Sequence, residues 1–225
     1  MLRNSKLDPK ICPDSYADRL VVITGATSGI GYATARKFAS QGATLLFINR
    51  NEGKSKELCE ELHTKFNSDC SYLIADFSKL ADVHSVAQVL VTLERDIDLI
   101  IHNADLYLTK KTFTIDNHEA IFQTNYLSTF LLNYYLREKL RNQKSGRILF
   151  VNSEAYRFSA FGMHMDDLRW DHHKYSGLQS YGSAKMAQLL SMIKFNEYFQ
   201  GSGITINAMH PGNVRTNSGQ SNGWL

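Results

Sequence analysis

The sequence predicts an α/β fold, a doubly wound parallel sheet with helices on both faces, in a single domain over residues 20–225. Short apolar segments alternate with longer helix-compatible segments along the chain, and this alternation is typical of parallel strands joined by right-handed crossovers. The first apolar segment, Leu20–Ile23, is mostly β-branched and does not alternate with polar residues, as expected for a strand covered on both faces. Residues 1–19 carry two prolines among polar residues and are predicted to be an N-terminal arm.

The other elements follow in order. A helix is predicted over 30–41, a buried strand over 43–48, and a charged helix over 51–66 in which Leu58 and Leu62 have helical spacing. The same reasoning predicts strands over 70–75, 98–104, 146–152 and 204–208, and helices over 82–93, 117–140 and 178–200. In such a sheet, ligands bind at the carboxyl ends of the strands.

Composition excludes several classes of protein. Hydrophobic residues make up 43% and charged residues 21% of the chain, as in soluble globular proteins, and a net charge of +3 without a dense basic block argues against a nucleic-acid partner. Three cysteines without C-x-x-C spacing predict neither disulfides nor zinc, and favour a reducing compartment. We find neither a signal-peptide pattern nor a run of about 18 apolar residues, so we expect a cytoplasmic protein without a transmembrane segment.

A glycine-rich turn follows the first strand. Gly25, Gly29 and Gly31 have the spacing G-x-x-x-G-x-G, which suits a sharp turn, a close approach of backbone to a pyrophosphate, and tight packing of the next helix on the sheet. The N-terminus of that helix would then bind phosphate through its unpaired N–H groups and its dipole. A turn without a ligand is the alternative, because glycine motifs recur by chance.

The second strand ends at Asn49-Arg50. An acidic residue near this position would bind the ribose hydroxyls of NAD, whereas a basic residue suits the 2′-phosphate of NADP. Since arginine binds phosphate through two parallel hydrogen bonds, the sequence favours NADP(H) over NAD(H). The alternative is a solvated arginine in a loop.

Tyr181 and Lys185 are four residues apart at the start of a predicted helix, and therefore lie on one face. A nearby cation lowers the pKa of a tyrosine, so Lys185 would make Tyr181 a usable proton donor and acceptor. Tyr-x-x-x-Lys alone is frequent by chance, and surface or packing roles explain most occurrences. The pattern gains weight here because Ser153 follows the fifth strand, at the same predicted edge as the glycine turn.

Together these motifs resemble the short-chain dehydrogenase/reductase family over roughly residues 18 to 217. The resemblance rests on Thr24–Gly31, His102–Ala104, Asn125, Ser153, Tyr181-x-x-x-Lys185 and His210–Gly212, in that order. Met165-Asp166-Asp167-Leu168 further resembles the branch of retinol dehydrogenases, WW-domain oxidoreductases and protochlorophyllide reductases. The resemblance implies a Rossmann-type sheet in the order 3-2-1-4-5-6 and an NAD(P)-dependent oxidoreductase.

The resemblance also implies roles for individual residues. Tyr181 would be the general acid in carbonyl reduction and the base in alcohol oxidation, and Ser153 would hydrogen-bond the reacting oxygen. Lys185 would lower the pKa of Tyr181 and bind the nicotinamide ribose, and Asn125 would hold a water that passes protons through Lys185 to solvent. The implied cofactor-binding residues are Gly25, Ser28, Gly29, Ile30, Gly31, Asn49, Arg50, Asp76, Asn103, Ala104, Tyr181, Lys185, Pro211, Gly212, Val214 and Thr216.

Structural roles remain as alternatives for three of these residues. Asn125 suits a cap or kink inside a long helix, Ser153 a turn at a strand end, and Asp76 the start of a helix. The constellation as a whole favours the functional roles.

The segment over 154–177 is longer than in the shorter members of the family and contains five aromatic residues, Tyr156, Phe158, Phe161, Trp170 and Tyr175. It suggests a bulky lipophilic alcohol or carbonyl substrate, of the retinoid, steroid or prenol kind. The aromatic side chains suit anchoring of the loop to the domain equally well. His172-His173 is expected to face solvent, and no metal is predicted.

The chain departs from the family pattern in two places where the family usually has glycine, Asp105 and Ser128. Asp105 adds a negative charge near the cofactor and is expected to weaken its binding. The chain also reaches only Leu225, so we expect the usual seventh strand and part of the substrate pocket to be missing. The alternative function is therefore a catalytically weak or inactive cofactor-binding or interaction protein. A homodimer or homotetramer through the helices over 117–140 and 178–200 is also expected.

Overall fold

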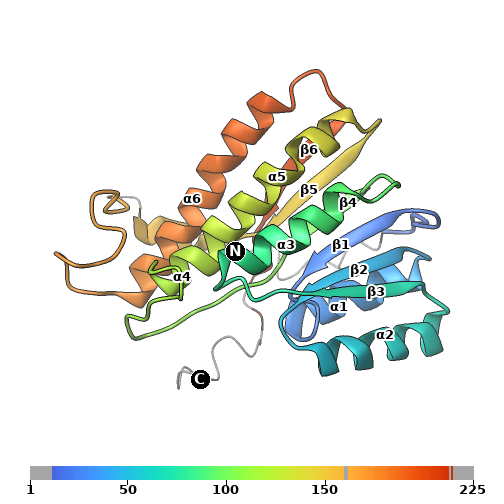
Figure 1. Ribbon diagram of the computed structural model, residues 1–225, viewed down its shortest axis with the longest axis horizontal. Helices are drawn as coiled ribbons and strands as arrows, with labels where there is room; N and C mark the ends of the chain where they lie inside the picture. The colour runs from blue at the N-terminus through green and yellow to red at the C-terminus, as the bar shows by residue number, and fades with distance from the viewer. Residues whose placement is uncertain (1–11, 160–161, 213, 215–225) are drawn as a thin grey trace.

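The computed structural model describes residues 12–159, 162–212 and 214. A six-stranded parallel sheet runs in the order β3-β2-β1-β4-β5-β6, which confirms the predicted Rossmann-type arrangement (Figure 1). The strands are β1 (Leu20–Thr24), β2 (Thr44–Asn49), β3 (Cys70–Ile74), β4 (Leu99–His102), β5 (Gly146–Val151) and β6 (Ile204–Met209). The helices are α1 (Gly29–Ser40), α2 (Glu52–Phe66), α3 (Leu80–Val91), α4 (Ala120–Phe122), α5 (Ser128–Asn142) and α6 (Gly177–Tyr198).

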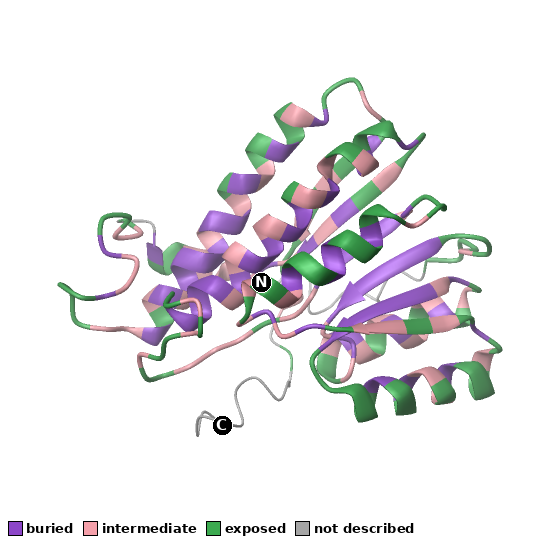
Figure 2. Cartoon of the chain, in the orientation of Figure 1, coloured by how far each residue is buried: buried purple, intermediate pink, exposed green. Residues whose placement is uncertain are grey.

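Two helical layers cover the sheet. Helices α3, α5 and α6 lie side by side over one face, and α1 and α2 cover the other (Figure 1). Strand β1 contributes to both cores, because Val22 packs in the cluster with α3 and α5 whereas Val21 and Ile23 pack in the cluster with α1 and α2. All five residues of β1 are buried, as the purple ribbon shows (Figure 2), and this explains the unbroken apolar run in its sequence.

Strand register brings four chain segments to one edge of the sheet. Ile23, Ile101, Leu149 and Asn207 pair in one row across β1, β4, β5 and β6. The segments that follow these strands therefore emerge side by side at their carboxyl ends. This edge holds the glycine turn, the segment from Asn103, Ser153 and the segment after Met209.

The predicted helix over 117–140 is corrected by the structure. Residues Gln123–Leu127 form a π-helical turn between α4 and α5, so the segment is not one regular helix. Contacts from outside the segment accompany this turn: Asn125 bonds through its side chain to Leu106 and through its carbonyl oxygen to Gln188. Sequence periodicity does not reveal such contacts.

The predicted strand over 98–104 is also shorter than expected. β4 ends at His102 because the N–H groups of Asn103 and Ala104 both donate to the Thr24 hydroxyl, at 3.0 and 2.9 Å. At the sheet's other end, no strand of the described residues pairs with the outer edge of β6, and the missing seventh strand stays a prediction. None of the helices in the described ranges has the length and apolarity needed to cross a membrane.

Candidate active site

The glycine turn between β1 and α1 depends on the absence of side chains. Gly25 has a φ of +70°, and a Cβ there would lie 2.8 Å from the Cα of Ala104. A Cβ on Gly31 would lie 2.3 Å from the carbonyl oxygen of Gly25. Gly29 also has a positive φ, of 55°. Glycines therefore allow the turn to pack directly against α1 and against the segment after β4.

Neutral hydrogen bonds fix this turn. Asn49, at the end of β2, accepts from the Ala26 N–H at 2.8 Å, and Asn103 donates to the Gly25 carbonyl oxygen at 2.9 Å. Asn49 is 2% exposed and also donates to Ser55. Its side chain thus supports the turn, and a contact from Asn49 to a cofactor stays a prediction.

The start of α1 is suited to an anion. Ser28 is its N-cap residue and is exposed, and its side chain makes no capping hydrogen bond. The first turn of α1 contains no acidic residue. Its unpaired N–H groups and the positive end of the helix dipole therefore remain available to a phosphate.

Two predicted cofactor residues lie at the ends of neighbouring strands. Arg50 directly follows β2 and is exposed. Asp76 follows β3, is half-buried, and accepts hydrogen bonds at Oδ1 from the N–H and the hydroxyl of Ser78. The structure thus places Arg50 free to meet a ligand, while one oxygen of Asp76 stabilises its own turn.

A cavity of about 200 Å³ opens at the carboxyl edge of the sheet. It brings together residues predicted to bind cofactor with residues predicted to be catalytic. The lining residues are Ile30, Asn103, Asp105, Val151, Asn152, Ser153, Tyr181, Lys185, His210, Pro211, Gly212 and Val214. Of the predicted site residues, Thr216 lies outside the described residues.

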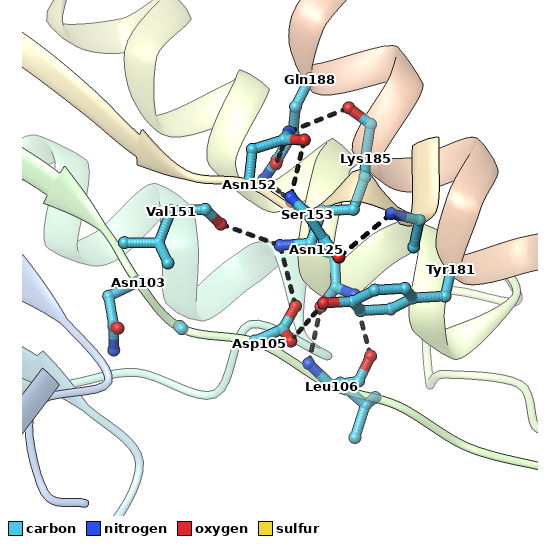
Figure 3. A network of polar contacts seen from close by, with 12 residues as sticks. Asn103, Asp105, Leu106, Asn125, Val151, Asn152, Ser153, Tyr181, Lys185 and Gln188 are labelled. Atoms are coloured by element: carbon cyan, nitrogen blue, oxygen red, sulfur yellow. Dashed lines mark hydrogen bonds and ion pairs between the residues drawn. The ribbon is translucent and has the colours of Figure 1, made fainter. Parts of the chain in front are cut away.

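Asp105 joins the two side chains of the Tyr-x-x-x-Lys motif (Figure 3). The Tyr181 hydroxyl donates to Asp105 Oδ2 at 2.8 Å, and Lys185 Nζ lies 3.0 Å from Asp105 Oδ1. Lys185 also donates to the carbonyl oxygen of Val151 at 3.1 Å, and its side chain is 2% exposed. The Asp105 carboxylate therefore binds both the Tyr181 hydroxyl, which is predicted to transfer the proton, and the Lys185 ammonium, which is predicted to bind the cofactor.

The pKa of Tyr181 is raised in this structure, whereas the sequence predicts that it is lowered. Burial raises the pKa of Tyr181 well above its ordinary value, and the charge and hydrogen-bond acceptance of Asp105 raise it further. A hydrogen bond from Ser153 acts in the opposite direction. In this arrangement burial and Asp105 therefore keep the pKa of Tyr181 raised, and the expected lowering by Lys185 stays a prediction.

Asn125 lies close to the cavity, but protein groups engage its polar atoms. Its side chain accepts from the Leu106 N–H and donates to the Leu106 carbonyl oxygen, both at 2.8 Å. Its own carbonyl oxygen accepts from Gln188 Nε2 at 2.7 Å and from Thr129 Oγ1 at 3.1 Å. Asn125 therefore anchors the segment after β4, and its predicted role in holding a water stays a prediction.

Sequence reasoning missed two residues of this network, Asn152 and Gln188. Asn152 donates to the Lys185 carbonyl oxygen at 3.0 Å and to Gln188 Oε1 at 2.9 Å, and accepts from the Ser153 N–H at 2.8 Å. Gln188 follows Tyr181 by seven positions in the sequence and therefore lies on the same helix face. This spacing is the sequence signal that could have identified Gln188. For Asn152 the signal was only that it directly precedes Ser153.

Hydrogen bonds and aromatic packing hold the long loop before α6. The Asp167 carboxylate accepts from the N–H groups of residues 171–173 and lies 2.8 Å from His173 Nδ1. Burial raises the pKa of Asp167, but these hydrogen bonds lower it more. The pKa of Asp167 therefore lies below its ordinary range. Trp170 is buried and packs edge-on against Tyr175, whose hydroxyl donates to Glu119.

These contacts favour the anchoring role for Trp170 and Tyr175, while Phe158 is 55% exposed and Phe161 lies outside the described residues. Within the described ranges, His172 and His173 belong to no cluster of potential metal ligands.

Several known proteins are similar to this chain over most of its length. Residues 19–165 match the family model described as short chain dehydrogenase. Human retinol dehydrogenase 13 is 30% identical over 94% of this chain and 64% of its own length, and the WW domain-containing oxidoreductase of Danio rerio is 29% identical over 93% and 52%. The chain thus spans less than two thirds of these relatives. A short-chain dehydrogenase from Sphingobium yanoikuyae, solved in complex with NADPH, superposes with a TM-score of 0.77 at 24% identity over 92% of this chain and 75% of its own.

Proposed function

The chain belongs to the short-chain dehydrogenase family, and we propose that it interconverts an alcohol and a carbonyl compound by hydride transfer, with NADP(H) as cofactor. The observation that carries this proposal is that Ser153, Tyr181 and Lys185 line one cavity together with Ile30, which lies between Gly29 and Gly31 of the glycine turn. A phosphate site and a proton donor at the same edge are what such a reaction needs.

The residues present fit a dinucleotide. The turn at Gly25 and Gly31 has no room for a Cβ, and the N-terminus of α1 offers N–H groups without an acidic neighbour in its first turn. In the proposal the N-terminus of α1 would hold the pyrophosphate, Arg50 would bind the 2′-phosphate, and the segment from Pro211 would contact the carboxamide. When bound, the nicotinamide supplies or accepts the hydride.

The protein's part in carbonyl reduction is proton transfer and orientation. Tyr181 donates its hydroxyl proton to the carbonyl oxygen, and Ser153 donates a hydrogen bond to the same oxygen as negative charge develops there. Asn152 bonds to the backbone of Lys185 and of Ser153, and Gln188 accepts a hydrogen bond from the Asn152 side chain. In alcohol oxidation the proton moves in reverse, from the alcohol to Tyr181.

The proposed substrate is bulky and lipophilic. Support comes from the name of the relative retinol dehydrogenase 13 and from Phe158 and Met165 on the loop before α6, which are 55% and 62% exposed. The proposal also extends to assembly through α5 and α6, where Tyr134, Leu190 and Ile193 are exposed; sedimentation of the purified chain tests it.

One observation favours a second candidate, a catalytically weak protein that binds the cofactor. Asp105 accepts the hydroxyl proton of Tyr181 in a hydrogen bond and pairs with Lys185. If the carboxylate stays there with the cofactor bound, the Tyr181 proton remains in the hydrogen bond to Asp105 and is not available to a substrate.

Titration with NADPH, followed by its fluorescence, tests cofactor binding first. A panel of retinaldehyde, a steroid ketone and a short polar aldehyde then tests turnover, with Tyr181→Phe as control. We expect the lipophilic carbonyls to be reduced and Tyr181→Phe to lose about 10²- to 10⁴-fold in kcat while it still binds NADPH. Binding without turnover supports the second candidate, and turnover that Tyr181→Phe leaves unchanged refutes the mechanism.

A further inference from the structure

Asp105 is the charged side chain in the cavity that the proposed reaction does not use. It lies in the segment that follows β4, while Tyr181 and Lys185 lie on α6, so only the tertiary fold brings the three together. Its two oxygens are divided between them, Oδ2 with the Tyr181 hydroxyl and Oδ1 with Lys185 Nζ (Figure 3). The carboxylate therefore engages the single proton of the Tyr181 hydroxyl and one of the three N–H donors of Lys185.

The competition is direct at both groups. The Tyr181 hydroxyl has one proton, and while it donates to Asp105 it cannot donate to a carbonyl substrate. The Lys185 side chain is almost fully buried and already donates to the Val151 carbonyl oxygen as well as to Asp105. A ribose hydroxyl that approaches Lys185 must therefore share its ammonium with Asp105 or replace Asp105 there.

The backbone on both sides of Asp105 is fixed. The N–H groups of Asn103 and Ala104 donate to Thr24, and Leu106 is held through its N–H and its carbonyl oxygen by Asn125. The Asp105 side chain is 24% exposed, which leaves it a path into solvent. Rotation of this one side chain is thus enough to release Tyr181 and Lys185, without movement of the segment.

Resting on the proposed function, we propose that Asp105 is a positioning residue that holds Tyr181 and Lys185 in a resting arrangement, from which the nicotinamide ribose displaces it. Catalysis then begins only after the cofactor has entered the cavity, because the ribose hydroxyls take the place of Asp105 on Lys185. Release of Asp105 also frees the Tyr181 hydroxyl to donate its proton to a substrate.

Two other titratable groups face this cluster. The Tyr107 ring lies edge-on to the Tyr181 ring at 5.6 Å between centroids, and His210 lines the same cavity from the segment after β6. The pH profile of the wild-type protein therefore combines the contributions of Tyr181, Lys185, Asp105, Tyr107 and His210. Differences between variants at position 105 isolate the contribution of the carboxylate.

The test compares two ligands on Asp105→Asn. NADPH reaches Lys185 through its nicotinamide ribose, whereas adenosine 2′,5′-bisphosphate has the adenine and 2′-phosphate without that ribose. We expect Asp105→Asn to lower the Kd for NADPH about tenfold, the size of one charge-assisted contact, and to leave the Kd for the bisphosphate unchanged. Asp105→Glu keeps the carboxylate, so its Kd for NADPH should lie close to the higher Kd of the wild type.

Asp96→Asn is the matched control, because Asp96 is exposed and precedes β4 at the opposite edge of the sheet. It removes the same charge and should change neither Kd. If Asp105→Asn lowered the Kd for both ligands by the same factor, the effect would be simple repulsion of anions and the proposed displacement would be overturned. An unchanged Kd for NADPH would also overturn it. If no variant binds either ligand, the proposed function itself fails.

A second readout needs no cofactor. The absorbance of tyrosinate is titrated in the wild type and in Asp105→Asn, each against its Tyr181→Phe counterpart, so that only Tyr181 contributes to the difference. The pKa of Tyr181 should fall in Asp105→Asn, because the phenolate loses an anionic neighbour and gains the uncompensated charge of Lys185. An unchanged titration of Tyr181 would show that Asp105 does not hold the pair in solution.

Discussion

Two regions meet in the cavity, and they are held by different interactions. The glycine turn is fixed by shape and by neutral hydrogen bonds from Asn49 and Asn103. The cluster of Tyr181 and Lys185 is fixed by charge, through the carboxylate of Asp105. Steric changes should therefore dominate in the first region, and changes of charge or protonation in the second. The following predictions test this division, from the largest expected effect to the smallest.

Gly31→Ala should destabilise the protein by about 3 kcal/mol, because its Cβ would overlap the Gly25 carbonyl oxygen and the Asn103 side chain. Gly53→Ala is the matched control, since Gly53 also lies in a helix but its Cβ would have no atom nearer than 3.6 Å. This control should stabilise the protein by about 0.5 kcal/mol. Urea unfolding measures both, and a Gly31→Ala protein as stable as the wild type would contradict the steric account of the turn.

His102 tests whether pH dependence also arises outside the charged cluster. It is fully buried at the end of β4, stacked on Phe150, and burial lowers its pKa to about 4 against the opposing hydrogen bond with Asn133. Because its folded-state pKa is lower than that of the unfolded chain, its contribution to stability is complete above about pH 6.5 and is lost as the pH falls towards 4. From pH 7 to pH 5 the loss should be about 2 kcal/mol.

Urea unfolding at the two pH values measures this loss in the wild type and in His102→Gln. The variant should lose much less stability between them. The exposed His172 provides the control, since His172→Gln should keep the wild-type loss. If His102→Gln behaves like the wild type, the acid sensitivity comes from other groups.

Arg50→Ala should have the smallest effect, an increase of about tenfold in the Kd for NADPH with little change in the Kd for NADH. Arg50 is exposed at the end of β2, so its loss should leave the fold intact. Lys56→Ala removes an exposed cation one turn into α2 and serves as the control for general electrostatic attraction. An equal effect of both variants on NADPH would remove the assignment of Arg50 to the 2′-phosphate.

Most of the fold could be predicted from the sequence. The apolar runs located the six strands because a parallel sheet covered on both faces requires them, and the sheet order came from the family resemblance. The family model and the retinol dehydrogenase and WW domain-containing relatives confirm that resemblance. The glycine spacing located the turn because Gly25 has a positive φ and a Cβ on Gly31 would meet the carbonyl oxygen of Gly25, and both constraints lie within the turn itself.

The contacts of the site were less predictable, because they join distant segments. The spacing of Tyr181 and Lys185 indicates a shared helix face. It does not indicate that Asp105, in the segment after β4, contacts both side chains. Asp105 was noticed in the sequence as a departure from the family, yet its expected effect was on the cofactor and not on Tyr181. The π-helical turn at Gln123–Leu127 likewise accompanies contacts with Leu106 and Gln188 that no periodicity reveals.

That π-helical turn makes the site sensitive to the length of one helix. It contains one residue more than an α-helical turn, and each residue of an α-helix advances the direction of the side chains by about 100°. Deletion of a single residue after Asn125 would allow a regular helix from α4 into α5. The same deletion would turn Asn125 away from Leu106 and so remove the contact that fixes the chain on the C-terminal side of Asp105.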